Sequence, residues 1–138
     1  MHTFDTVQKF LTTQLFCVVS TIGDDGAPQS SYVAFSESPD GKIAFGTFAD
    51  ARKFGNIQRE PRVSIVVSDG DVSVQIEGMA RIVTGDDEAR IREQHLAKNP
   101  ASKKYAFDPR QRFVVVTPTW LRYTNLGTDP DTVEELRF

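Results

Sequence analysis

The sequence predicts a mainly β fold: one small, closed antiparallel β-barrel with peripheral helices, formed as a single domain by residues 1–138. Three observations lead to this prediction. Apolar and polar residues alternate with period two along much of the chain, which indicates half-buried strands. Turns rich in Gly and Asp separate neighbouring strands at hairpin spacing. Gly78 interrupts the long strand expected at residues 72–83, and a glycine there indicates a bend that lets one strand serve two sides of a barrel.

The elements follow from local patterns. The strands are expected at residues 15–22, 29–37, 42–48, 62–68, 72–83 and 113–126, with a possible edge strand at 132–138. Residues 3–13 carry apolar side chains at helical spacing and predict an amphipathic lid. A second, short helix is expected to begin with Asp50 as its N-cap and to end at Pro61. Residues 86–98, acidic at their start, predict a third helix.

Composition excludes several classes of function. The net charge of −3 provides no electrostatic footprint for nucleic acid or an acidic membrane surface. Cys17 lies in an apolar run and is expected to be a buried, inert thiol, and a lone cysteine excludes a disulfide framework or a multi-cysteine zinc site. No signal peptide is visible, and no apolar stretch approaches the ~20 residues that span a bilayer, so we expect a cytoplasmic protein.

Side-chain chemistry points to no catalytic residue and no metal ligand. His2 is terminal, and His95 lies at the edge of the apolar stripe of its helix, where a packed or solvated histidine is expected. The serines lack a nucleophile-elbow context, and no G-x-G-x-x-G follows a strand. The carboxylates cluster in turns and at helix starts, where turn and capping chemistry explains them.

The most informative stretch is residues 47–61. Arg52 and Lys53 fall in the first turn of the predicted helix, where the helix dipole is already positive and backbone N–H groups lack partners. Two cations there make a good anion site, although Asp50 could instead offset the dipole while both cations face water. Gly46 ends the preceding strand, and small residues there let a flat ligand lie against the backbone. A phosphate at the helix start and a planar ring along the strands together describe a flavin mononucleotide (FMN) site.

Here the chain resembles a known family. The segments "IAFGT", Arg52–Lys53, "NIQREPRVSIVV" and "VQIEGMARIV" stand in the order and spacing of the pyridoxamine 5′-phosphate oxidase-like superfamily of FMN-binding split barrels. The resemblance covers roughly residues 5–125. It implies an antiparallel FMN-binding split barrel that forms a homodimer, with two FMN sites at the subunit interface.

The resemblance also assigns roles to residues. Arg52 and Lys53 match the pair that grips the flavin phosphate. The segments along the isoalloxazine ring and ribityl chain are Gly46–Thr47 and Ser31–Tyr32–Val33. Ser73 falls near the position where the oxidases carry a glutamine that contacts the ring, and Trp120 matches a late aromatic residue near the cofactor.

Two departures from the vitamin B6 oxidases stand out. Ser31 replaces the arginine that opens their second strand, and the segment from Thr119 to Phe138 lacks the arginine and histidine that hold their pyridoxal substrate. We therefore expect a flavin-dependent oxidoreductase that acts on another, unassigned small molecule, and not a true pyridoxamine 5′-phosphate oxidase.

Two alternatives keep the same fold. The first is a reductase that uses the deazaflavin F420, whose longer acidic tail would require further cations such as Arg59, Arg62 and Arg81. The second is a flavin- or haem-binding protein without turnover, acting in storage, sensing or stress response. For haem, neither His2 nor His95 is placed in the sequence as an obvious axial ligand.

Overall fold

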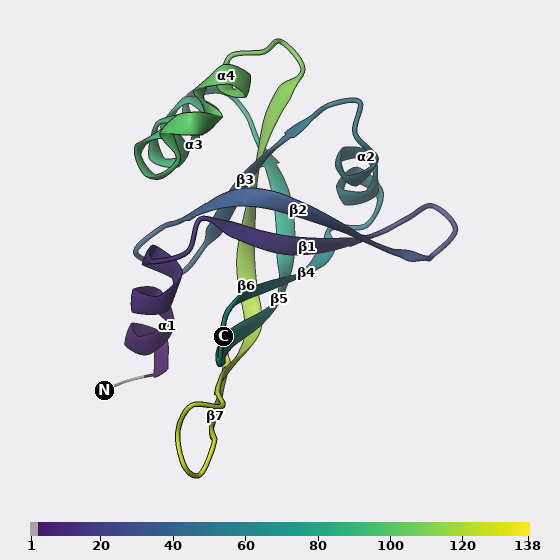
Figure 1. The fold of residues 1–138 in the computed structure, drawn as a ribbon. Coiled ribbons are helices and arrows are strands. Elements are labelled where there is room, and N and C mark those ends of the chain that lie inside the picture. Colours follow the sequence, from purple (N-terminus) through teal and green to yellow (C-terminus); the bar gives the residue numbers. More distant parts are fainter. Residues whose placement is uncertain (1–2) are drawn as a thin grey trace.

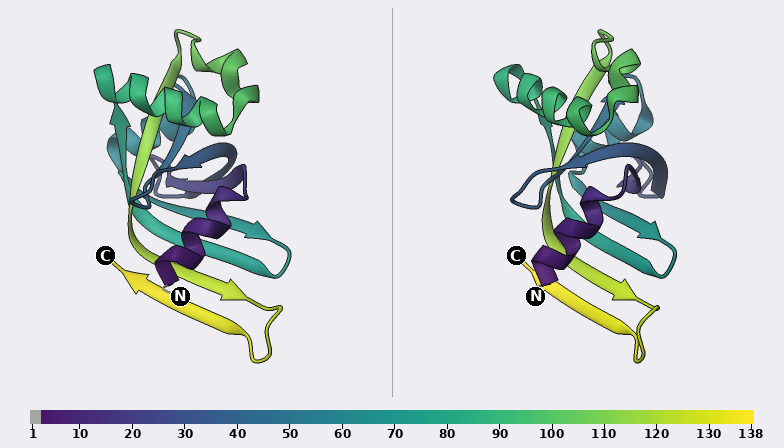
Figure 2. Two further views of the ribbon diagram at one scale, coloured as in Figure 1. Left: turned by 90° about the vertical axis from the view of Figure 1, so that its left-hand side faces the viewer. Right: turned by 60° about the vertical axis from the view of Figure 1, so that its left-hand side comes forward.

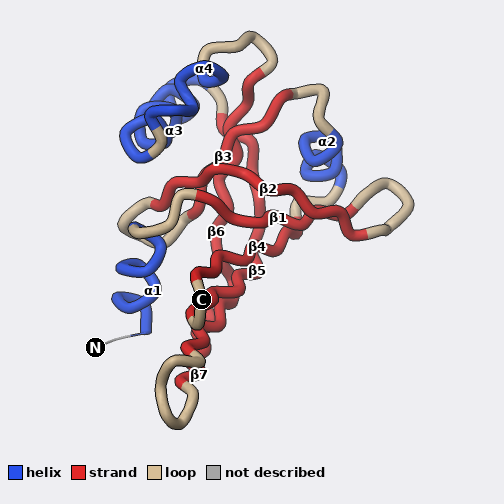
Figure 3. Tube along the Cα trace, in the orientation of Figure 1, coloured by secondary structure: helices blue, strands red, loops and turns tan. Residues whose placement is uncertain are grey.

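The computed structural model describes residues 3–138 and contains a closed antiparallel barrel with helices around it (Figures 1 and 3). Within these residues, seven strands form one sheet in the order β3-β2-β1-β4-β5-β6-β7, and an additional pairing of β3 with β6 closes the first six into a barrel. The strands are β1 (Phe16–Ile22), β2 (Pro28–Glu37), β3 (Ile43–Phe48), β4 (Arg62–Asp69), β5 (Val72–Val83), β6 (Gln111–Asn125) and β7 (Thr132–Arg137). The helices are α1 (Thr3–Thr12), α2 (Arg52–Arg59), α3 (Gly85–Lys98), the 3-10 turn η1 (Pro100–Ser102) and α4 (Lys103–Ala106). The predicted mainly β split-barrel fold is confirmed.

The bend predicted at Gly78 is present. The register between β5 and β6 shifts between Glu77 and Gly78, so the two halves of β5 pair with different stretches of β6. A side chain at Gly78 would place its Cβ 2.6 Å from the carbonyl oxygen of Thr117, which is closer than real contacts allow. The bend therefore needs glycine because the neighbouring backbone occupies the space. Beyond it, the β4–β5 and β6–β7 hairpins extend away from α3 and α4 (Figure 2).

The apolar core fills the barrel interior. Its fully buried members include Val19, Phe35, Phe45, Val74 and Val114. A second, smaller cluster lies outside the main core, between α3 and the barrel wall; it consists of Ala44, Val83, Ile91, Phe113 and Val115. β3 and the first half of β6 are therefore covered on both faces, which explains why their sequences are almost continuously apolar.

The helices attach to different parts of the sheet (Figures 1 and 2). α1 buries Val7 and Leu11 as the predicted lid, and the Thr3 hydroxyl donates to Glu134 of β7. α2 is tied to the barrel by Asn56, whose side-chain NH₂ donates to Thr21 (3.0 Å) and Gln29 (2.8 Å). No helix within residues 3–138 is both long enough and apolar enough to cross a membrane.

Two local predictions had different outcomes. The predicted burial of Cys17 is confirmed, with 2% of its surface exposed, and burial raises the pKa of its thiol to about 12, which disfavours the reactive thiolate. The prediction that Asp50 caps α2 is wrong. The N-cap is Ala51, and no side chain caps this helix. The Asp50 carboxylate instead lies 3.8 Å from the Arg110 guanidinium, in an exposed pair that contributes little to stability.

Candidate functional site

A cavity of about 690 Å³ lies between the barrel and the segment that contains α3 and α4. We call it the main cavity. Five of the residues assigned to the cofactor line it: Tyr32, Val33, Gly46, Thr47 and Lys53. They come from β2, from the end of β3 and from the start of α2, which the barrel brings together because β2 and β3 are neighbours in the sheet. The volume is that of a typical small-molecule or cofactor site.

The start of α2 gives one end of the main cavity the character of an anion site. Ala51 and Lys53 line the cavity together with the acidic residue Asp50, and the first turn of α2 itself contains no acidic residue. Burial lowers the pKa of the Lys53 ammonium below its usual value. Within residues 3–138, no hydrogen bond or ion pair engages this ammonium group. A partly desolvated cation beside an uncapped helix start attracts a phosphate group.

Aromatic rings form another part of the wall. The rings of Phe16 and Tyr32 stack with centroids 5.0 Å apart, and 72% of Tyr32 is exposed. Phe48 meets Tyr105 of α4 edge-on at 6.1 Å between centroids. All four residues line the main cavity. Flat, partly exposed rings of this kind offer stacking surfaces to a planar ligand.

The C-terminal end of α3 supplies the third part of the wall. Lys98 is held by the Glu37 carboxylate and donates to the carbonyl of Leu11 at 3.0 Å. The Asn99 side chain donates to the carbonyl of Phe35 at 2.8 Å. Their polar groups are therefore already used within the chain, which makes these two residues structural supports of the wall.

His95, beside Lys98 and Asn99, differs from them. Only 3% of its surface is exposed, and its Nδ1 is the one buried side-chain nitrogen or oxygen without a hydrogen-bond partner in the described part of the chain. Burial, aided by the nearby Lys98 charge, lowers the pKa of the imidazole to about 4. Of the two expectations for His95, packed or solvated, the structure shows the packed one, and the imidazole is also a neutral polar group at the cavity wall. His2 lies outside the described residues.

Gly46 has a clear structural reason to be glycine. A Cβ at this position would lie 2.1 Å from the side-chain nitrogen of Gln111, so the buried Gln111 amide occupies the space beside the Gly46 backbone. From the sequence we expected a flat ligand to occupy this space, and in the structure the Gln111 side chain occupies it instead. Gln111 also lines the main cavity and brings an amide close to the predicted ring position.

The remaining predicted site residues lie elsewhere. Arg52 is exposed, and neither Arg52 nor Ser31 is among the residues that line the main cavity. Trp120 lines a groove on β1, β4 and β6 with Val18 and Ser64. Ser73 pairs with Thr124 in the half of the sheet that projects away from α3 (Figure 2). Within a single chain, therefore, none of these four predicted residues lines the main cavity.

The cations considered for the tail of F420 also lie outside this cavity. Arg59 donates to the Asn56 side-chain oxygen at 2.6 Å, and Arg62 is paired with Glu60. Arg81 lines a different cavity.

Sequence reasoning missed the wall made by the α3–α4 segment. Of its members, His95 is separated from Lys53 by more than forty residues of chain, and nothing local to either indicates their proximity. The one available signal was a histidine within an otherwise apolar stripe, which is typical of packing as well as of binding.

Comparisons with known proteins agree with this architecture. Residues 3–125 match the family described as pyridoxamine 5′-phosphate oxidase. No curated protein is significantly similar to the chain.

Solved structures share the fold at low sequence identity. A haem-binding protein from Mycobacterium smegmatis superposes with a TM-score of 0.77 at 21% identity, covering 90% of this chain and 53% of that one, so the present chain spans about half of that relative. General stress protein 26 from Bacillus anthracis gives 0.79 at 22% identity, with all of both chains covered. A Clostridium acetobutylicum protein related to general stress protein 26, of the pyridoxinephosphate oxidase family, gives 0.75 at 13% identity, covering 97% and 93%. The chain therefore belongs to the pyridoxamine 5′-phosphate oxidase family, within its superfamily of split barrels.

Proposed function

We propose that the protein binds FMN in the main cavity and acts as a flavin-dependent oxidoreductase on a small molecule. The observation that carries this proposal is the unpaired, partly buried Lys53 at an uncapped helix start, on the edge of a cavity walled by aromatic rings. Such a site offers a cation to a phosphate and flat surfaces to a ring system, which are the two ends of FMN. Family membership supports the same cofactor.

In this proposal the chain binds and orients the cofactor. Bound flavin would supply hydride transfer, which needs no acid or base from the protein. Lys53 holds the phosphate end, Tyr32 and Tyr105 border the ring, and the Gln111 amide can hydrogen-bond a polar edge of the ring. The reductant that we propose is NAD(P)H, and the compartment that we propose is the cytoplasm.

The absorption spectrum of the purified protein tests this function. We expect a yellow protein with a flavin spectrum that is bleached by NAD(P)H in the absence of oxygen. A flavin spectrum that NAD(P)H leaves unchanged would support binding without turnover, in storage or sensing. A colourless protein that binds F420 and not FMN would contradict the proposed cofactor.

Haem binding without turnover is the second candidate. It is supported by the buried His95 imidazole at the cavity wall, whose Nδ1 has no partner and whose neutral form can ligate iron. The similar Mycobacterium smegmatis structure is of a haem-binding protein. A Soret band after haem is added, lost in His95→Phe but retained in Lys53→Ala, would favour this candidate over FMN.

We also propose that the protein is a homodimer with the cofactor at the subunit interface. Leu15, Phe16 and Tyr32 leave 48%, 47% and 72% of their surfaces exposed beside the main cavity, and association would bury them. Ser73 and Trp120, which lie away from the main cavity of their own chain, could then reach that of the partner.

Light scattering is expected to report twice the 15.4 kDa chain mass. A monomer at micromolar concentration with flavin bound would contradict the dimer.

A further inference from the structure

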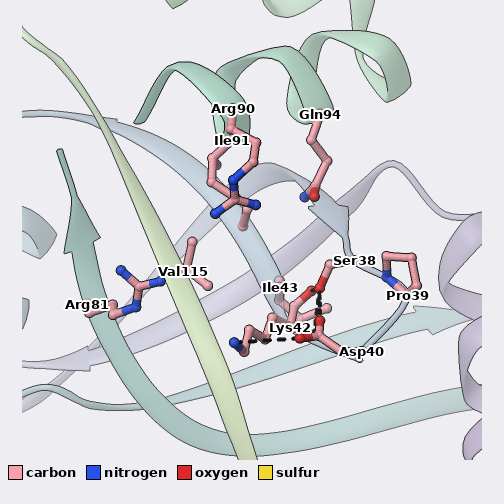
Figure 4. Close-up of a pocket in the computed structure, with 11 residues that line it drawn as sticks. Ser38, Pro39, Asp40, Lys42, Ile43, Arg81, Arg90, Ile91, Gln94 and Val115 are labelled. Atoms are coloured by element: carbon pink, nitrogen blue, oxygen red, sulfur yellow. Dashed lines mark hydrogen bonds and ion pairs between the residues drawn. The ribbon is translucent and has the colours of Figure 1, made fainter. Parts of the chain in front are cut away.

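A second cavity, of about 330 Å³, lies under the N-terminal half of α3 and beside the β2–β3 turn. Three basic residues from three separate elements line it: Lys42 after the turn, Arg81 on β5 and Arg90 on α3. Figure 4 shows their charged ends on three sides of one opening, with Ser38 and Asp40 beside Lys42. This basic cavity shares no lining residue with the main cavity.

The charges around the basic cavity are unbalanced. Asp40 is the one carboxylate among its lining residues, and Arg90 also pairs with Asp87 outside the lining, so Arg81 is the cation left without an anionic partner among residues 3–138. Asp40 is already engaged, because the Ser38 hydroxyl donates to it and the Lys42 ammonium lies 3.5 Å away, and both hold its pKa below the usual value. The whole chain, by contrast, carries a net charge of −3. A local excess of cations in an acidic protein creates a field that attracts small anions.

The two arginines are available to a ligand. The Arg81 guanidinium has no hydrogen-bond or ion-pair partner among residues 3–138. Arg90 pairs with Asp87 at 3.0 Å, but both side chains are largely exposed, so this pair contributes little and can be exchanged for a ligand. Like charges gathered around one opening repel each other, and a bound anion would relieve that repulsion.

The floor of the basic cavity is apolar. Ala44, Ile91 and Val115, all members of the second cluster, form it together with Ile43. Each of these four side chains is at most 5% exposed, so the floor is closed and offers little surface to cover. The volume of the cavity exceeds what an inorganic phosphate ion requires, so a phosphate that carries a small organic body fits it better.

We propose that the basic cavity is a binding site for a small phosphate monoester with an apolar body, separate from the main cavity. Arginine forks match phosphate oxygens in pairs, and a phosphate dianion offers enough acceptor oxygens to bind the free Arg81 and to replace the exposed Asp87 as the partner of Arg90. Lys42 adds a point charge from the turn. The site therefore combines Arg81 and Arg90 as anion-binding residues with a closed apolar floor that includes Ile91 and Val115.

Calorimetric titration of the purified full chain with phenyl phosphate tests this proposal, with phenol, benzoate and inorganic phosphate as comparison ligands. We expect phenyl phosphate to bind more tightly than any of the three. The double variant Arg81→Gln/Arg90→Gln should weaken its binding by about tenfold or more, since both residues make charge-assisted hydrogen bonds. The control Lys9→Gln/Arg137→Gln removes the same charge from exposed positions elsewhere and should leave the affinity within about twofold.

Further measurements keep this test separate from the proposed flavin site. Because phenyl phosphate also matches the phosphate and ring ends of the main cavity, the arginine variants are compared in the Lys53→Ala background. Phenyl phosphate should still bind Lys53→Ala, and ¹H–¹⁵N spectra should show perturbed amides at Arg81 and Arg90. If the arginine double variant folds poorly, Arg81→Gln alone should still weaken binding severalfold. Unchanged affinity in the arginine variants, equal binding of phenol, or loss of binding in Lys53→Ala instead would each overturn the proposal. None of these outcomes depends on whether the protein binds FMN.

Discussion

The double variant Arg52→Ala/Lys53→Ala is expected to lose about 10²-fold or more in affinity for FMN. A charge-assisted hydrogen bond to a ligand anion contributes roughly 1.5–3 kcal/mol, and each 1.4 kcal/mol is tenfold in affinity. Lys53 should carry the larger share, because it lines the main cavity while Arg52 is exposed outside it. Lys53→Ala alone should therefore weaken FMN binding more than Arg52→Ala alone.

Riboflavin provides the matched ligand, because it lacks the phosphate. Its affinity should be nearly the same for the wild type and the double variant, as measured by calorimetry or by quenching of flavin fluorescence. Arg62→Ala serves as the control variant, since it removes a cation from an exposed pair outside the main cavity. The apo-protein should not be destabilised, because two cations leave the positive end of α2. Equal FMN affinities in the wild type and the double variant would mean that this helix start does not hold the phosphate.

Acidification is expected to remove about 3 kcal/mol of folding stability between pH 6.5 and pH 4 through His95 alone. Burial lowers the pKa of His95 to about 4 in the folded state, against an ordinary value of 6.5 in the unfolded chain, and one pKa unit corresponds to about 1.4 kcal/mol. Between these two values the unfolded chain binds the proton and the folded chain does not, so stability falls as the pH falls. This contribution is fully present above pH 6.5 and lost by about pH 4.

Urea denaturation at pH 7 and pH 4.5 measures the effect, with His95→Phe as the test variant and His2→Gln as the control. Phenylalanine keeps the edge contact with Phe113 and cannot take up a proton. Carboxylates with lowered pKa, such as Asp40 and Asp108, also weaken the fold in acid, but they remain in both variants and cancel in the comparison. If wild type and His95→Phe lose the same stability on acidification, His95 is already protonated or solvated in the folded state.

Local patterns predicted the elements well because alternation reports which face of a strand meets the core. Val63, Ile65 and Val67 alternate with polar residues and are buried as that pattern implies. Turn residues placed the hairpins. The predicted helix cap is wrong because residue type alone favoured Asp50, whereas the N-cap position falls one residue later, at Ala51, whose side chain cannot cap.

By itself, the sequence determined a barrel of antiparallel strands, the bend at Gly78, the buried thiol of Cys17 and the cation at the start of α2. These features depend on neighbours a few residues apart, so local chemistry decides them. Only the tertiary structure decided which side chains share a cavity: it placed His95, Gln111 and Tyr105 around Lys53 and gathered Lys42, Arg81 and Arg90 around one opening. The physical reason is that closure of β3 onto β6 and the docking of α3 on their outer faces bring together residues that are far apart in the chain.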